Sequence, residues 1–217
     1  MGSTTLALLT VLAVSQVRSR AQVSEVSAGW KRGRTDLFGE GFPAEYYDVR
    51  GEAARDYFFA GLSMARTLPT ALPDLKRIMR NGGSVRLLLP NPNNVALLTM
   101  VAETKSGGRS ASVRRKIEHA IATANAELAS LARSGTFEVR VTDVLPRIGI
   151  NAFDVDEPGG RIMIQMYQFQ PTEESAPIFI LGHDDAPWYE HFRREASALW
   201  ESGTVWKTSA SARKRSR

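Results

Sequence analysis

The sequence predicts an α/β fold, a mixed sheet with helices on both faces. Three observations lead to this class. Short apolar runs alternate with segments of helical spacing between residues 56 and 131, and four further apolar runs follow one another between residues 136 and 182. A last helical segment then closes the domain. Alternating strands and helices favour a parallel sheet, and consecutive strands favour antiparallel additions to it.

The first half of the domain supplies two strands and three helices. Residues 56–64 form an aromatic-rich apolar run, typical of a buried strand. Helical spacing follows and stops at a diglycine, Gly82-Gly83, as expected at a helix end. Residues 84–90 are the second strand, and a helix is predicted over residues 94–102. Apolar residues at steps of three and four then predict a long amphipathic helix over residues 113–131.

The second half adds four strands and one helix. Residues 136–144 alternate as a half-buried strand, residues 147–169 predict a β-hairpin, and residues 176–182 predict another strand. Asp185 is expected to cap the last helix, with Pro187 in its first turn. The predicted inner stripe of that helix is Trp188, Phe192, Ala196 and Leu199.

The chain divides into four predicted parts: an apolar N-terminal helix (1–20), a connecting segment (21–52), the α/β domain (53–206) and a basic disordered tail (207–217). Residues 4–17 are apolar on every side of a helix, so such a helix must be buried in something. Three interpretations stay open: a short membrane anchor, a signal peptide, or a helix packed on the domain or on another copy. An anchor followed by Arg18 and Arg20 would leave the body in the cytoplasm, at the inner membrane face.

The positive charge of the chain lies in the tail. The 217 residues carry 28 basic and 23 acidic side chains. Five of the basic ones lie in residues 207–217, and without them 23 basic residues face 23 acidic ones. We therefore expect a formally neutral domain, and contact with nucleic acid only weakly, through the tail.

Composition and motifs exclude several kinds of site. The chain has no cysteine, which excludes disulfides, cysteine-based zinc sites and a cysteine nucleophile. It has neither a phosphate-binding glycine loop nor clustered metal ligands. No cofactor and no metal are therefore expected.

The order of these elements resembles one half of the phospholipase D-like fold. Three segments carry the resemblance: "GLSMARTLP", "NGGSVRLLLPNP" and "WYEHFRREASALW". The resemblance covers roughly residues 53–206. Within this superfamily, the chain looks close to uncharacterised bacterial domains that are attached to regulatory or signalling modules. Because single halves commonly pair across the site, the resemblance implies a homodimer or a higher oligomer.

The superfamily signature, His-x-Lys-x-x-x-x-Asp, is degenerate here. The resemblance aligns Gly149 with the nucleophilic histidine, Asn151 with the phosphate-binding lysine and Asp156 with the aspartate. Glycine cannot form a phospho-enzyme, and asparagine brings no charge to a phosphate. No catalytic residue of this kind is therefore predicted.

An anionic, phosphate-bearing ligand is nevertheless expected at the ends of the strands, where open α/β sheets bind ligands. The candidate ligand-binding residues are Ser63, Arg66, Asn91, Asn93, Arg147, Asn151 and Asp156, with Asn94 and His183 in neighbouring loops. This pattern favours a non-catalytic sensor or interaction module. Two alternatives remain: a phosphodiesterase or nuclease with a rearranged site using His183, Asp184 and Arg147, and an assembly subunit that uses its N-terminal helix.

Overall fold

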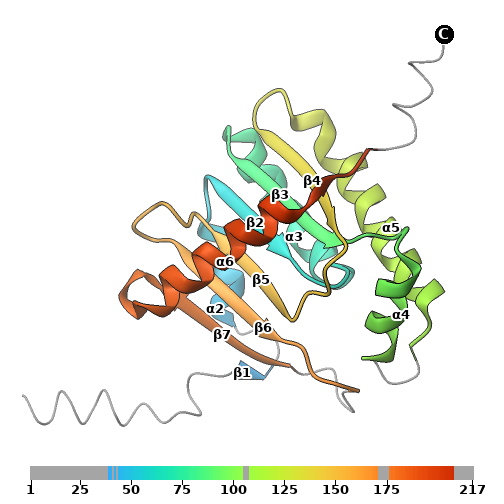
Figure 1. Ribbon diagram of the computed structural model, residues 1–217. Helices are drawn as coiled ribbons and strands as arrows, with labels where there is room; N and C mark the ends of the chain where they lie inside the picture. Colours follow the sequence, from blue (N-terminus) through green and yellow to red (C-terminus); the bar gives the residue numbers. More distant parts are fainter. Residues whose placement is uncertain (1–38, 41, 43, 105–107, 171–175, 208–217) are drawn as a thin grey trace, which may run out of the picture. The chain divides into compact units, whose positions relative to one another are not determined.

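The protein is described by a computed structural model that covers residues 39–40, 42, 44–104, 108–170 and 176–207. Its centre is an eight-stranded mixed sheet with the strand order β1-β7-β6-β5-β2-β3-β4-β8 (Figure 1). The strands are β1 (Gly39–Glu40), β2 (Asp56–Ala60), β3 (Ser84–Pro90), β4 (Thr136–Thr142), β5 (Ile148–Phe153), β6 (Arg161–Met166), β7 (Pro177–Gly182) and β8 (Thr204–Val205).

The sheet has a parallel half and an antiparallel half, as the sequence predicts. Strands β2, β3 and β4 are parallel neighbours. Beyond β2 the sheet continues with β5, β6 and β7, each antiparallel to the strand before it. The short edge strands β1 and β8 pair antiparallel with β7 and β4, and neither is predicted from the sequence. Two-residue strands carry too little periodicity to be recognised.

Helices cover both faces of this sheet. On one face lie α2 (Ala44–Glu52), α3 (Thr67–Arg80), α4 (Val95–Glu103) and α5 (Ser110–Leu128), and on the other lies α6 (Trp188–Ser202), as Figure 1 shows. Strand β2 illustrates how the sheet serves both layers. Its Tyr57 and Phe59 pack with the four helices, whereas Phe58 and Ala60 pack under α6. All four side chains are at most 5% exposed, so the strand is buried on both faces, as parallel strands generally are.

The helix boundaries follow local chemistry. Helix α3 ends at Arg80, and Gly82 then adopts φ 83°, a left-handed conformation that favours glycine. Helix α4 begins after Asn94, whose side chain accepts a hydrogen bond from the Leu97 amide. The long helix α5 buries Val113, Ile117, Ala120, Ile121, Ala124 and Leu128, a set that the helical periodicity predicts.

Two expectations about the last helix are wrong. Asp185 does not cap α6: its carboxylate accepts from the Gly182 amide and closes a short 3-10 turn, His183–Asp185. Trp188 is 60% exposed, so it is not part of the inner stripe. Phe192, Ala196 and Leu199 pack on the sheet as predicted, and the helix also buries Tyr189 and Trp200.

The predicted connecting segment contributes to the fold at its end. Helix α2 and β1 both lie within residues 39–52, and Tyr46 of α2 is 1% exposed. Arg50 of the same helix is also buried, and its guanidinium bonds Asp74 and Thr70 of α3. These bonds attach α2 to the domain.

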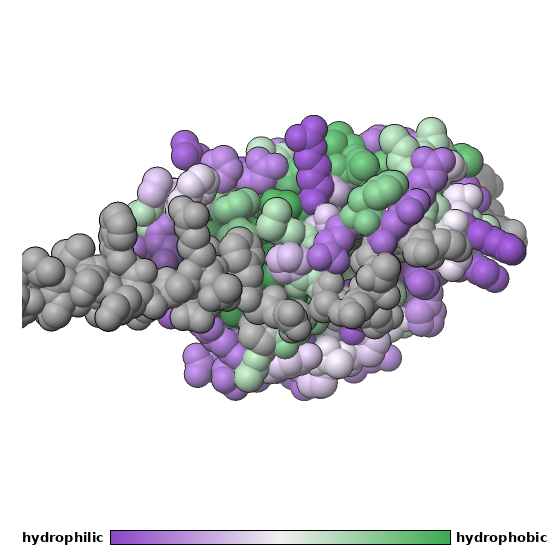
Figure 2. Space-filling model, turned by 90° about the horizontal axis from the view of Figure 1, so that it is seen from below, coloured by the Kyte–Doolittle hydropathy of each residue, from purple (hydrophilic) through white to green (hydrophobic). Residues whose placement is uncertain are grey.

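The predicted N-terminal helix at residues 1–20 and the predicted tail lie outside the described residues, apart from Lys207. Within the described ranges, no helix combines the length and apolar character that a membrane crossing requires. Seen from below, hydrophobic residues reach the surface between hydrophilic ones (Figure 2).

Candidate functional site

The carboxyl ends of β2, β3 and β4 meet at one end of the sheet, and we call this the carboxyl end. Because β5 runs antiparallel to β2, it begins at this end, and because β6 runs antiparallel to β5, it finishes there. The loops at this end carry five of the predicted ligand-binding residues: Ser63, Arg66, Asn91, Asn93 and Arg147.

Tyr167 fills the position that the resemblance assigns to the nucleophilic histidine. Its hydroxyl lies against two backbone glycines, Gly61 after β2 and Gly149 in β5. A Cβ atom would lie 2.6 Å from this oxygen at Gly61 and 2.7 Å from it at Gly149. The Leu62 amide donates to the hydroxyl at 3.2 Å, and burial raises the pKa of Tyr167 to about 12. The hydroxyl is therefore neutral at physiological pH, and any side chain at Gly149 would force Tyr167 to shift.

Asn151, at the lysine position, is also withdrawn from any ligand. It is 1% exposed, and its Oδ1 accepts a hydrogen bond of 2.8 Å from the Tyr57 hydroxyl. Burial raises the pKa of Tyr57 well above its usual value. The pair is a neutral hydrogen bond inside the core, and it supplies no charge to the carboxyl end.

The asparagines after β3 organise their own loop. Asn91 and Asn94 each donate a side-chain amide to Asp143, which follows β4, at 3.0 Å. The Asn91 side-chain oxygen accepts from the Asn93 amide. These bonds tie the ends of β3 and β4 together and occupy donors that were predicted to face a ligand.

At the opposite end of the sheet, where β5 turns into β6, the charges are paired. Asp154 has φ 45° and accepts hydrogen bonds from the amides of Ala54, Arg55 and Asp56, at 2.7–2.8 Å. Asp156 lies 3.5 Å from Arg193 of α6. These contacts make the turn a structural joint between β5, β2 and α6.

His183 also lies at this opposite end. Its Nε2 is 2.9 Å from the Glu157 carbonyl oxygen, and its ring contacts Tyr189 at 4.2 Å between centroids. Because β5 and β7 run in the same direction, Arg147 before β5 and His183 after β7 are separated by the length of a strand. A strand of six residues spans about 20 Å at roughly 3.3 Å per residue.

The expected convergence of all candidate residues at one edge is therefore wrong. Asp156, His183 and Asp184 lie at the opposite end, Asn151 lies in the core, and the other candidates lie at the carboxyl end. The sequence places residues at strand ends but does not give the direction of β7, which decides the end at which His183 lies. Arg147 cannot share one site with His183 and Asp184 in this arrangement.

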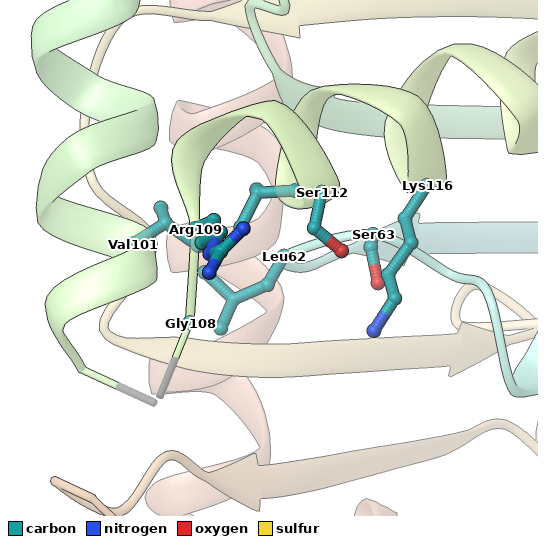
Figure 3. Close-up of a pocket in the computed structure, with 8 residues that line it drawn as sticks. Leu62, Ser63, Val101, Gly108, Arg109, Ser112 and Lys116 are labelled. Atoms are coloured by element: carbon teal, nitrogen blue, oxygen red, sulfur yellow. The ribbon is translucent and has the colours of Figure 1, made fainter. Parts of the chain in front are cut away.

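A cavity of about 40 Å³ opens beside the carboxyl end (Figure 3). Its polar lining consists of Ser63, from the loop after β2, and Arg109, Ser112 and Lys116 at the start of α5. Apolar walls come from Leu62, Val101 and Val113. In Figure 3 the side chains of Ser112 and Lys116 extend from the helix toward Ser63.

Three of these polar residues were not predicted as ligands. Arg109 and Ser112 precede the helix predicted over residues 113–131, and Lys116 lies in that helix but not in its apolar stripe. One signal was present: Ser112 and Lys116 are four residues apart and so share a helix face.

A second cavity, of about 340 Å³, lies at the opposite end. Acidic and basic side chains both line it, namely Glu52, Arg55, Asp154, Glu157 and Arg161. Arg55 pairs with Glu157 at 3.1 Å, and Arg161 donates to the carbonyls of Gly159 and Gly160. Its charges are thus largely used within the protein. Among the described residues, no group of three or more acidic or histidine side chains could hold a metal ion.

Comparisons with known proteins give a family and two distant structures. A family model described as a domain of unknown function (DUF5919) matches residues 61–206, more than half of the chain. No curated protein matches. One similar solved structure is TrmBL2, an archaeal chromatin protein described as showing a novel mode of DNA binding. It is 11% identical, has a TM-score of 0.48, and the match covers 93% of this chain and 66% of that one. Another is Nuc from Salmonella typhimurium, a phospholipase D family member: 13% identity, TM-score 0.44, covering 79% of this chain and 98% of that one.

Proposed function

For a chain that belongs to the DUF5919 family, a domain of unknown function, we propose the role of a non-catalytic phospholipase D-like module that binds a phosphate-bearing ligand. The observation that carries this proposal is the Tyr167 hydroxyl packed against Gly149. A phospholipase D-type reaction needs an imidazole at this position to accept the phosphoryl group. Here the position is a glycine with a neutral phenol against it. Such a module can hold an anion without cleaving it.

Support for an anionic ligand comes from the carboxyl end. Arg66, Arg147, Arg109 and Lys116 all lie at this end or beside it, and cations there favour phosphate groups. The bonded asparagines Asn91 and Asn94 hold the loop between β3 and α4 in place. A fixed loop costs less ordering when a ligand binds.

The test combines turnover with binding. The full chain is incubated with bis(4-nitrophenyl) phosphate, and its thermal unfolding is measured with and without phosphate. We expect no release of nitrophenolate above buffer, together with a phosphate-dependent rise in Tm. Release that scales with protein concentration and disappears in His183→Ala would replace this proposal with the rearranged enzyme.

We also propose that two copies pair across the carboxyl end. Exposed large apolar side chains gather on the segments that follow these strand ends: Val95, Met100, Val144, Met166 and Phe169. Exposed apolar groups of this kind mark protein contacts when they are contiguous. Sedimentation of the full chain should give the mass of a dimer, and Phe169→Ser with Met166→Ser should shift it toward the monomer. A monomer in the unsubstituted chain would contradict pairing.

Residues 1–20 decide the cellular location in this proposal. A cytoplasmic protein held at the inner membrane face through this segment should move from the membrane pellet to the supernatant when the segment is deleted. If the segment instead packs on protein, the deletion should change the oligomeric mass and leave the fractionation unchanged.

A further inference from the structure

We infer that the cavity between Ser63 and α5 is the phosphate-binding site, and that it takes a tetrahedral oxyanion. This inference rests on the proposed function, because it names where and how the anionic ligand is held. The four polar residues of the cavity are Ser63, Arg109, Ser112 and Lys116. We call them the oxyanion set.

The charge of the cavity selects an anion. Two of the oxyanion set are cationic, two carry hydroxyl groups, and none of the described residues that line the cavity is acidic. Neither Arg109 nor Lys116 forms an ion pair with another described residue. Unpaired cations facing a shared hollow attract an anion, whereas Arg55 and Glu157 at the opposite end of the sheet pair with each other.

The geometry of the cavity selects a tetrahedral ion over a planar one. Ser63 comes from the loop after β2, whereas Ser112 and Lys116 extend toward it from α5, so the donors face each other across the hollow (Figure 3). A carboxylate presents its acceptors in one plane, but phosphate and sulfate present oxygens in all directions. A lysine ammonium and serine hydroxyls can meet such oxygens from opposite sides.

The size of the cavity limits what enters it. About 40 Å³ of free volume corresponds to room for roughly three water molecules, at 10–15 Å³ each. This room suits one phosphate group and is too small to enclose a sugar or a base. The apolar walls at Leu62, Val101 and Val113 remove water from one side and strengthen the remaining contacts.

The cavity is linked through Leu62 to the Tyr167 hydroxyl, which lies against Gly149. Leu62 lines the cavity, and its amide donates to the Tyr167 hydroxyl. An anion in the cavity therefore changes the surroundings of this amide. The Leu62 amide resonance provides a readout that a distant surface effect would not move.

The experiment titrates the full chain with sodium phosphate at constant ionic strength, by calorimetry. The test variant is Arg109→Gln with Lys116→Gln. Its matched control is Arg114→Gln with Arg115→Gln, which removes the same charge from the same helix but touches no part of the cavity lining. We expect the test variant to lose at least tenfold in phosphate affinity and the control to lose less than threefold. Ser63→Ala should weaken binding by a smaller factor, and phosphate should shift the Leu62 amide resonance.

The other outcomes are distinguishable. Equal loss in both double variants would overturn the site, because it would indicate general attraction by α5. Binding that survives in the test variant but disappears in Arg66→Gln with Arg147→Gln would also overturn it, while leaving the proposed function intact. No phosphate binding by the unsubstituted chain would contradict both.

Comparing anions tests the tetrahedral geometry and identifies the source of the phosphate group. Sulfate should compete with phosphate and acetate should not, and equal competition by acetate would overturn the tetrahedral assignment. Glycerol 3-phosphate binding as tightly as phosphate would support the oxyanion set with a phosphomonoester as its ligand. Binding of phosphate alone would support it with the free ion as its ligand.

Discussion

The two ends of the sheet carry similar polar side chains in different states. Where β5 turns into β6, Asp154 accepts from three backbone amides, and Arg55 pairs with Glu157. Beside the carboxyl end, Arg109 and Lys116 have no ion-pair partner among the described residues. Charges that are satisfied internally stabilise a fold, whereas unpaired charges around a hollow are available to a ligand. We therefore propose that the end where β5 turns into β6 stabilises the fold, and that the carboxyl end is the one available to a ligand.

The largest expected effect is a loss of stability when the turn between β5 and β6 is disrupted. Asp154→Ala removes three charge-assisted hydrogen bonds and places alanine at φ 45°, so we expect the free energy of unfolding to fall by about 3 kcal/mol. Urea denaturation measures this change. Asp156→Ala is the control, because it removes only a surface contact with Arg193 and should cost less than about 0.5 kcal/mol. If the two substitutions lowered the free energy of unfolding equally, the structural role assigned to Asp154 would be contradicted.

Alkaline pH tests whether the Tyr167 hydroxyl is buried. Burial raises the pKa of Tyr167 to about 12, whereas an unfolded tyrosine has a pKa of about 10. The raised pKa contributes stability that is fully present below pH 10 and is lost as the pH rises toward 12. Tyr167→Phe lacks this contribution, so its stability should decline less between pH 10 and 12, by at most about 3 kcal/mol. Parallel curves for the two proteins would show that the hydroxyl is not buried.

A smaller effect tests the contact between Tyr167 and Gly149. Gly149→Ala puts a methyl group within 2.7 Å of the hydroxyl oxygen and should cost about 1–2 kcal/mol. In the Tyr167→Phe background that oxygen is absent, so the cost should shrink, which a double-mutant cycle measures. Gly159→Ala, where a Cβ meets nothing within 4 Å, is the neutral control. Costs that add without coupling would contradict the contact.

The smallest effect concerns the loop at the carboxyl end. Asp143→Ala removes the acceptor of Asn91 and Asn94 at an exposed site, and we expect a loss of about 0.5–1 kcal/mol in urea denaturation. If the loop only supports the ligand site, phosphate affinity should change less than threefold. A larger loss of affinity would place this loop in direct contact with the ligand.

The sequence was sufficient for elements that local chemistry determines. The end of α3 before Gly82, the cap at Asn94 and the buried stripe of α5 follow from neighbouring residues. The mixed sheet with helices on both faces followed from their order. The hairpin of β5 and β6 also formed as predicted.

The candidate site could be predicted only in part, because it depends on contacts between distant segments. The position of His183 depends on the direction of β7, and the position of the Tyr167 hydroxyl depends on its contacts with Gly61 and Gly149. No local pattern encodes a contact over 106 residues of chain, from Gly61 to Tyr167. Arg109 and Lys116 likewise line one cavity with Ser63 only because α5 lies beside the loop after β2.

We propose that the carboxyl end of the sheet binds a phosphate group and does not cleave a phosphodiester. ³¹P NMR of the full chain with inorganic phosphate and methyl 4-nitrophenyl phosphate, a small diester with a good leaving group, observes both properties in one spectrum. We expect the phosphate resonance to broaden or shift with added protein while the integrated intensity of the diester stays constant. A growing monoester resonance that follows protein concentration, or a phosphate resonance unchanged at any protein concentration, would overturn this function.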